Sequence, residues 1–113
     1  MFAELEASIG YAFKDEALLT HAMTHKSSVK PEKDPNGLTS NERLEFLGDA
    51  VIDCLVTAEL YNRYPTSPEG KLSKMKSLLV SRKILGVIAD RIELSKFIVR
   101  GRSEKKNRRK GSN

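Results

Sequence analysis

The segment from Ser40 to Tyr64 constrains the fold most, because its apolar residues recur at helical spacing and it contains no proline. Residues three and four apart share one face of a helix, so the pattern predicts one long amphipathic helix. Pro65 follows at once and disfavours the helical conformation in the residue before it. The segment begins with Thr39-Ser40-Asn41-Glu42, which has the form of a capping box. We therefore expect the central helix of the domain here.

The rest of the chain also shows helical periodicity, with no alternating strand pattern of useful length and no internal repeat. Further helices are expected at about 2–9, 15–24, 68–80 and 81–91, with a short turn at 95–99. We expect Pro68 at the first helical position and Ser81 as a cap. Two prolines and an Asn-Gly pair predict a surface loop over 30–37. The sequence thus predicts one all-α domain.

Composition narrows the class of protein. Apolar runs reach only a few residues, so we expect no membrane-spanning helix and no association with a membrane. The first ten residues carry two glutamates and no basic region, unlike a signal peptide. The single cysteine, Cys54, cannot form an internal disulfide. These features predict a soluble protein in the cytoplasm whose fold is held by its core.

The net charge of +5 comes from the end of the chain. Residues 1–100 carry equal numbers of acidic and basic side chains, whereas residues 101–113 carry six basic side chains and one glutamate. We therefore divide the chain into a domain over 1–100 and a basic, flexible loop or tail over 101–113. The tail is interpreted either as a solvated end or as a contact for a polyanion such as nucleic acid.

One face of the central helix is acidic. With about 100° of rotation per residue, Glu42, Glu45, Asp49 and Asp53 fall within about 80° of one another. The opposite side carries an apolar stripe that is expected to face the core, namely Leu44, Leu47, Val51, Cys54 and Leu55.

A solvated face of an amphipathic helix is the ordinary explanation for such charges. However, a solvated face commonly alternates charges of opposite sign, and here like charges repel one another. Phe46 places an aromatic ring on this polar side, and Gly48 weakens the middle of the helix. Mg²⁺ takes oxygen ligands, and two carboxylates one turn apart fit one edge of its coordination shell. Together these features favour a divalent-cation site beside an interface, suited to phosphodiester cleavage.

The residues of this helix resemble a known signature. Asn41-Glu42-Arg43-Leu44-Glu45-Phe46-Leu47-Gly48-Asp49-Ala50-Val51 is similar to the signature motif of the ribonuclease III family, which cuts double-stranded RNA. The segments at 19–27, 68–73 and 79–81 also resemble the family, in the family's order, and the resemblance covers about 10–105. It implies the helical endonuclease domain of that family, working as a homodimer with an RNA-binding valley between two metal sites.

The resemblance also implies roles for individual residues. Glu45 matches a ligand of Mg²⁺, with Mn²⁺ as the alternative ion, and Asp49 matches a catalytic acidic residue beside that ion. Glu42 and Glu69 match acidic positions with secondary roles near the cleavage site. Phe46 matches the aromatic residue that inserts into the partner subunit. Asp53 matches no family position with a role and is expected on the solvated surface.

The sequence departs from the family at its end. The resemblance implies an Asp-x-x-Glu pair on a later apolar helix, and this chain stops at Asn113, in the loop expected to precede that helix. The only such pair here, Asp90 with Glu93, lies before the loop and is rejected as a substitute. We therefore expect an incomplete endonuclease domain that is inactive or weakly active alone.

Other candidate sites have ordinary alternatives. His21 and His25 have a spacing that can bind zinc on a helix, but hydrogen-bonded histidines are the preferred interpretation. Three lysines after the central helix are candidates for RNA phosphate contacts, or equally for a solvated face: Lys71, Lys74 and Lys76. No glycine-rich phosphate loop occurs, so no nucleotide cofactor is expected.

The expected function is Mg²⁺-dependent hydrolysis of double-stranded RNA during RNA processing. Two alternatives remain open. One is a non-catalytic RNA-binding or ribosome-associated scaffold with the same fold, which the presence of Glu45 and Asp49 disfavours. The other is a dimeric interaction domain that does not touch RNA.

Overall fold

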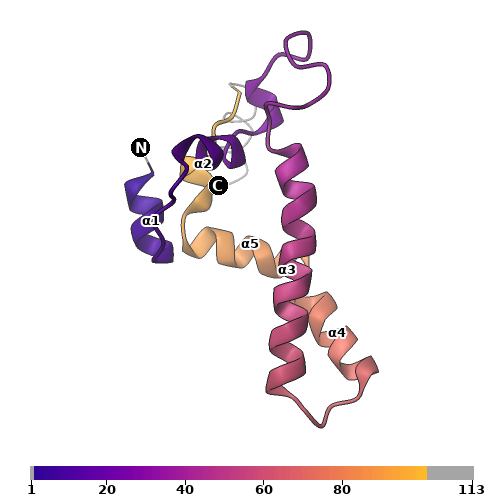
Figure 1. The fold of residues 1–113 in the computed structure, drawn as a ribbon. Coiled ribbons are helices and arrows are strands. Elements are labelled where there is room, and N and C mark those ends of the chain that lie inside the picture. Colours follow the sequence, from indigo (N-terminus) through magenta and orange to yellow (C-terminus); the bar gives the residue numbers. More distant parts are fainter. Residues whose placement is uncertain (1, 102–113) are drawn as a thin grey trace.

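The computed structural model describes residues 2–101, and this part of the chain is helical with one isolated β-bridge. The elements, in chain order, are α1 (Ala3–Ile9), α2 (Glu16–Ala22), η1 (Lys26–Ser28), α3 (Glu42–Arg63), α4 (Glu69–Leu79), α5 (Arg82–Arg91) and η2 (Leu94–Phe97) (Figure 1). The predicted all-α class is confirmed. None of these helices has the length and apolar composition needed to cross a membrane. Residues 102–113 of the expected basic tail lie outside the described residues.

Two of the α-helices begin with side-chain caps. The Asp15 carboxylate accepts a hydrogen bond from the Leu18 N–H (3.1 Å) at the start of α2. The Ser81 hydroxyl accepts one from the Ile84 N–H (3.3 Å) at the start of α5, as the sequence predicted. These bonds satisfy backbone donors that have no partner within the first helical turn.

The start of α3 differs from the expected capping box. Asn41 is the N-cap residue but makes no capping bond, because its Nδ2 donates to the carbonyl oxygen of Ala22 (2.9 Å). Ser40 is buried instead of capping the helix. Pro68 likewise is the N-cap of α4 and not its first residue, since its ψ of 160° is extended. In α3 a contact with another helix has taken the place of the local cap.

Several hydrogen bonds join the end of α2 to the start of α3. The Asn41 N–H donates to the carbonyl of Thr24 (2.8 Å), and Nε2 of His21 lies 2.9 Å from the carbonyl oxygen of Ser40. The residues that follow α2 are held in turn by the β-bridge between Thr24 and Val99. In this bridge the Val99 N–H donates to the carbonyl oxygen of Met23 (2.8 Å). The direction of α3 is therefore set at its N-terminal end. We call this group of contacts the α2–α3 joint.

The core lies at one end of the molecule and α3 extends away from it. Its buried members are Phe2, Leu5, Leu19 and Met23, covered by Ile92, Leu94, Phe97 and Ile98. These residues come from α1, α2 and the segment around η2, which gather at one side in Figure 1. The helix α4 returns alongside the far half of α3, where Leu60 is buried.

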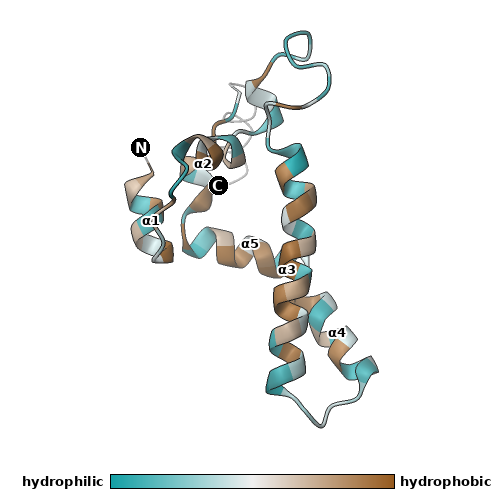
Figure 2. Cartoon of the chain, viewed as in Figure 1, coloured by the Kyte–Doolittle hydropathy of each residue, from teal (hydrophilic) through white to brown (hydrophobic). Residues whose placement is uncertain are grey.

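The expected core stripe of α3 is not buried. Leu47, Val51 and Leu55 are 57%, 47% and 64% exposed, and Cys54 is also exposed. Hydrophobic residues, coloured brown, recur along the length of α3 in Figure 2. The prediction was wrong because α4 packs against the far half of this helix, around Leu60, and not along the stripe.

The contacts of the α2–α3 joint should contribute to the free energy of unfolding. Asn41→Ala removes a bond that spans two helices and leaves the Ala22 carbonyl without that donor, so we expect a loss of about 1–3 kcal/mol in the free energy of unfolding. Asn62 is a matched control, because its Nδ2 donates to Ala58 O at the same 2.9 Å within exposed α3. Asn62→Ala should change stability by about 0.5 kcal/mol or less. Urea denaturation measures both, and equal losses would contradict the role of the joint.

Candidate metal centre

Glu45 and Asp49 lie one turn apart in the first half of α3, and both are exposed. Four helical residues advance about 6 Å along the axis, so the two carboxylates can approach one ion from the same side. Carboxylate oxygens are the ligands that Mg²⁺ prefers, and this ion keeps several waters. Among residues 2–101, however, no group of three or more His, Cys, Asp or Glu side chains is arranged to hold a metal. The described residues thus supply one edge of a coordination shell.

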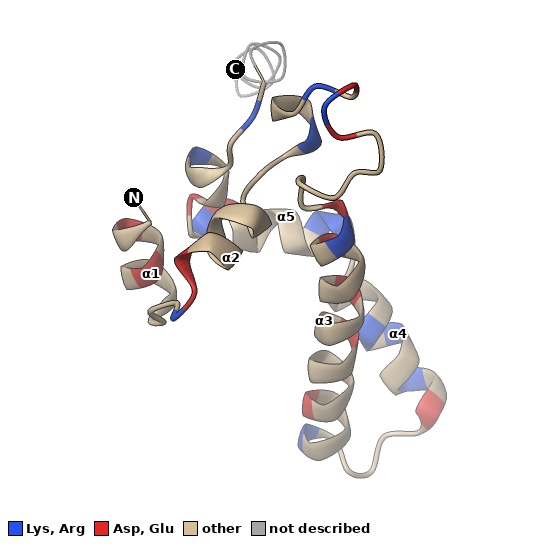
Figure 3. Ribbon diagram, turned by 45° about the horizontal axis from the view of Figure 1, so that its top comes forward, with Lys and Arg blue, Asp and Glu red and all other residues tan. Residues whose placement is uncertain are grey.

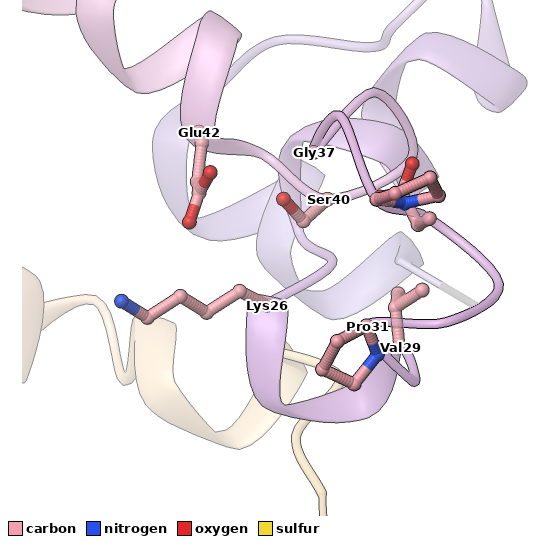
Figure 4. A pocket seen from close by; sticks show the side chains of 8 residues that line it. Lys26, Val29, Pro31, Gly37, Ser40 and Glu42 are labelled. Atoms are coloured by element: carbon pink, nitrogen blue, oxygen red, sulfur yellow. The ribbon is translucent and has the colours of Figure 1, made fainter.

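The Glu42 side chain occupies a different environment from Glu45 and Asp49. It lines a pocket of about 340 Å³ together with Lys26 and Ser40 (Figure 4). Its Oε2 lies only 2.8 Å from the position that a Cβ on Gly37 would take. Gly37 has a φ of +64°, a left-handed conformation that favours glycine, and a Cβ there would meet the end of the flexible Glu42 side chain. Glu42 is therefore placed beside the loop before α3.

Asp34 holds that loop in shape. Its carboxylate accepts hydrogen bonds from the backbone N–H groups of Thr39 (3.0 Å) and Leu38 (2.9 Å) and from the Thr39 hydroxyl (2.8 Å). These bonds, first of all that from the Thr39 N–H, lower the pKa of Asp34 below its ordinary value. The carboxylate therefore stays ionised while it organises residues 34–39.

The structure does not bring Glu69 to the metal centre. Glu69 begins α4 and lines a separate pocket of about 250 Å³ with Leu60 and Tyr61. Leu60 is eleven residues beyond Asp49, which corresponds to about 16 Å along the axis of α3. Within one chain, Glu69 therefore lies beside a different part of α3 from the part that carries Glu45 and Asp49.

The candidate RNA-binding lysines share one element. Lys71, Lys74 and Lys76 all lie on α4, which carries several basic residues in Figure 3. Lys71 and Lys74 are exposed, whereas Lys76 is half-buried and lines the same pocket as Glu69.

Asp53, on α3, is half-buried, and so it is not on the freely solvated surface where it was expected.

The two histidines are hydrogen-bonded. They do not share a helix face as the sequence suggested, because α2 ends at Ala22. His21 bonds to the carbonyl of Ser40, and Nδ1 of His25 accepts from the Ser27 N–H (3.1 Å). The preferred interpretation of these residues is thus confirmed.

Phe46 is 81% exposed, the value expected of a side chain that is free to contact another chain. It lines a pocket of about 540 Å³ together with Glu42, Arg43 and Leu47.

Sequence reasoning missed the side chains around Glu42. Lys26, Ser40 and Gly37 meet there although nothing in their spacing pairs them with a carboxylate. The one local signal was Asp34-Pro35-Asn36-Gly37, whose residue types are typical of a turn with a left-handed glycine.

Comparison with known proteins assigns the chain to a family. Residues 15–113 match the family model described as ribonuclease-III-like. Ribonuclease 3 of Geobacter metallireducens is 43% identical over 104 residues, which are 92% of this chain and 42% of that protein. Ribonuclease 3 of Listeria monocytogenes serotype 4a is 42% identical over 103 residues, 91% of this chain and 44% of that protein. The chain thus spans less than half the length of these relatives.

Two solved structures of the nuclease domain of ribonuclease III from Campylobacter jejuni are also similar. One has a TM-score of 0.84 and 42% identity, and covers 95% of this chain and 70% of the other; it is described as flexible in a region involved in dimer formation. The second has a TM-score of 0.81 and 43% identity, and covers 92% and 66%. The signature on α3, the helical fold and these matches agree, and the chain belongs to the ribonuclease-III-like family, with the fold of its nuclease domain.

Proposed function

We propose that this chain serves the cleavage of double-stranded RNA, with Mg²⁺ held on the outer face of α3 by Glu45 and Asp49. The observation that carries the proposal is that both carboxylates are exposed and lie one turn apart, in a chain of a nuclease family. Like charges so placed repel each other, and a bound cation offsets that repulsion.

The donor set fits Mg²⁺ in part. Glu45 and Asp49 offer hard oxygen ligands, and the remaining positions suit water, substrate phosphate and further carboxylates such as the Asp-x-x-Glu pair that the resemblance implies. When bound, the ion lowers the pKa of coordinated water and balances the charge of the phosphate during hydrolysis. The contribution of this chain is to anchor and orient that ion from the rigid surface of a helix.

The substrate is RNA duplex, bound through its phosphates. The lysines of α4 supply ammonium groups that neutralise backbone charge without reading bases. A non-catalytic scaffold does not require carboxylates at both of these positions of the family signature, so the presence of Glu45 and Asp49 favours cleavage. We place the protein in the cytoplasm, where its exposed Cys54 remains reduced.

The proposed assembly is a homodimer anchored by Phe46. A largely exposed aromatic ring on the polar side of a helix suits burial in a second chain. One similar Campylobacter jejuni nuclease domain has a region involved in dimer formation, which is consistent with this assembly.

The metal site is tested by cleavage of a labelled RNA duplex. The chain is extended with a C-terminal segment that bears Asp-x-x-Glu, and we expect Mg²⁺-dependent cutting that chelator abolishes. Glu45→Gln or Asp49→Asn removes a ligand charge with little change of shape, and each should slow cleavage by about 100-fold or more. Asp53→Asn, one turn beyond Asp49, is the matched control and should retain activity. Cutting that survives chelator or both substitutions would refute the site.

The dimer is tested by sedimentation equilibrium. Phe46→Ala removes a proposed buried anchor, so the dissociation constant of the dimer should rise by about 30-fold or more. Tyr61→Ala is the control, because Tyr61 is a similarly exposed aromatic residue near the other end of α3. A monomeric wild-type chain, or equal effects of the two substitutions, would count against Phe46 as the anchor.

A further inference from the structure

We propose that Asn36 is a site of spontaneous deamidation, and that the isoaspartyl product opens the loop before α3. The reaction needs no enzyme and no cofactor, because the main-chain nitrogen of Gly37 is the nucleophile and water completes the conversion. The chain would thereby undergo an age-dependent change of charge and shape beside the first turn of α3. The inference goes beyond the proposed function, since it concerns this loop and not the metal ligands.

Asn36 differs from the other asparagines that the structure describes. It is the only asparagine of the chain that is followed by glycine. The side chains of Asn41 and Asn62 are held, because each Nδ2 donates to a main-chain carbonyl oxygen at 2.9 Å. Asn36 is exposed, and its side chain has no hydrogen-bond partner within residues 2–101. Its carboxamide is therefore free to turn toward the neighbouring main chain.

Asn36 and Gly37 lie at the tip of a turn in an exposed loop. This loop joins η1 to α3 and projects away from the helices at the top of Figure 1. The Gly37 N–H donates to the carbonyl oxygen of Asp34 (3.1 Å), and this one bond closes the turn. Gly37 has no side chain, so nothing on that residue screens its nitrogen from the Asn36 carboxamide. The two reacting groups are thus adjacent in a part of the chain that packing does not immobilise.

The chemistry balances with water alone. The Gly37 nitrogen attacks the side-chain carbonyl carbon of Asn36, so that a new C–N bond forms and the bond to Nδ2 breaks. Nδ2 leaves as ammonia and takes with it the proton of the attacking nitrogen. Water then opens the cyclic imide at either carbonyl. Opening at the side-chain carbonyl gives an aspartyl residue, whereas opening at the main-chain carbonyl gives an isoaspartyl residue, in which the main chain is one methylene longer.

The Asp34 carboxylate makes the loop sensitive to this extra methylene. It accepts hydrogen bonds from the N–H groups of Leu38 and Thr39 and from the Thr39 hydroxyl. The main chain from Asp34 to Leu38 passes through position 36, so an isoaspartyl link lengthens the span that these bonds close. Hydrogen bonds weaken steeply when their distances and angles depart from the preferred range. We therefore expect the modified loop to lose at least one of them.

The change reaches the start of α3. Asn36 and Gly37 line the pocket of about 540 Å³ together with Glu42 and Arg43. Gly37 and Glu42 also border a common space in Figure 4, where Oε2 of Glu42 lies 2.8 Å from the position of a Cβ on Gly37. Both products place a carboxylate where a neutral amide stands. The pocket thus gains a negative charge near Glu42, and like charges repel each other.

Deamidation is measured on the folded 113-residue chain during incubation in mildly alkaline buffer. Samples are digested, and mass spectrometry with separation of aspartyl and isoaspartyl peptides follows each asparagine. We expect Asn36 to convert about 10-fold or more faster than Asn41 and Asn62, whose side chains must first break a hydrogen bond. Asn36→Gln keeps the amide but moves it one methylene farther from the nitrogen of Gly37, and it should give no product at this position.

Hydrogen exchange tests the opening of the loop. In the purified isoaspartyl chain, the amides of Leu38 and Thr39 should exchange about 10-fold faster, the effect of losing one hydrogen bond. The Leu18 amide is the matched control and should not change, because it is bonded to the carboxylate of Asp15 (3.1 Å) at another helix. Asn36→Asp adds the charge without the longer main chain, so exchange at Leu38 and Thr39 should stay within about 3-fold of the wild type.

The inference is overturned if Asn36 stays intact in the folded chain while it converts in urea, because the turn would then protect the site. It also fails if the isoaspartyl chain keeps the wild-type exchange at Leu38 and Thr39, or if Asn36→Asp opens the loop as far as the isoaspartyl link does. None of these results bears on metal-dependent cleavage, which is measured separately.

Discussion

The α2–α3 joint is the contact on which the rest of the structure depends. Asn41 and His21 bond across it, so the first turn of α3 is held by α2 rather than by its own cap. The small core lies with α1, α2 and η2, and α3 projects from it toward α4. The direction of the acidic face and the position of the pocket before α3 are therefore fixed by a few hydrogen bonds at one end of a long helix.

The carboxylates of the acidic face belong to different environments although they share a helix. Glu42, Glu45 and Asp49 are all exposed, but only Glu42 lies against Gly37 and lines the pocket with Lys26. Glu69, on α4, lies beside the far half of α3. This arrangement separates the proposed metal ligands at the middle pair from the carboxylate at the start of the helix.

The sequence predicted what depends on local chemistry. The order of the helices, the Ser81 cap, the turn at Gly37 and the family signature on α3 could all be read from residue types and spacing. Burial could not be read in this way, because helical periodicity shows that Leu47 and Leu55 share a stripe but not which element covers it. The capping box failed for a similar reason, since Asn41 bonds to another helix. The pocket of Lys26 and Glu42 depends on the path of a loop, which spacing does not determine.

The most direct test of the central claim, that Glu45 and Asp49 hold a divalent cation, is paramagnetic broadening by Mn²⁺ in the amide NMR spectrum of the labelled chain. The metal site on α3 predicts that substoichiometric Mn²⁺ broadens signals around residues 45 and 49 first, that excess Mg²⁺ restores them, and that Asp49→Asn weakens the effect. Broadening centred on Glu69 or on Asp90 and Glu93, or spread evenly over the acidic residues, would contradict it.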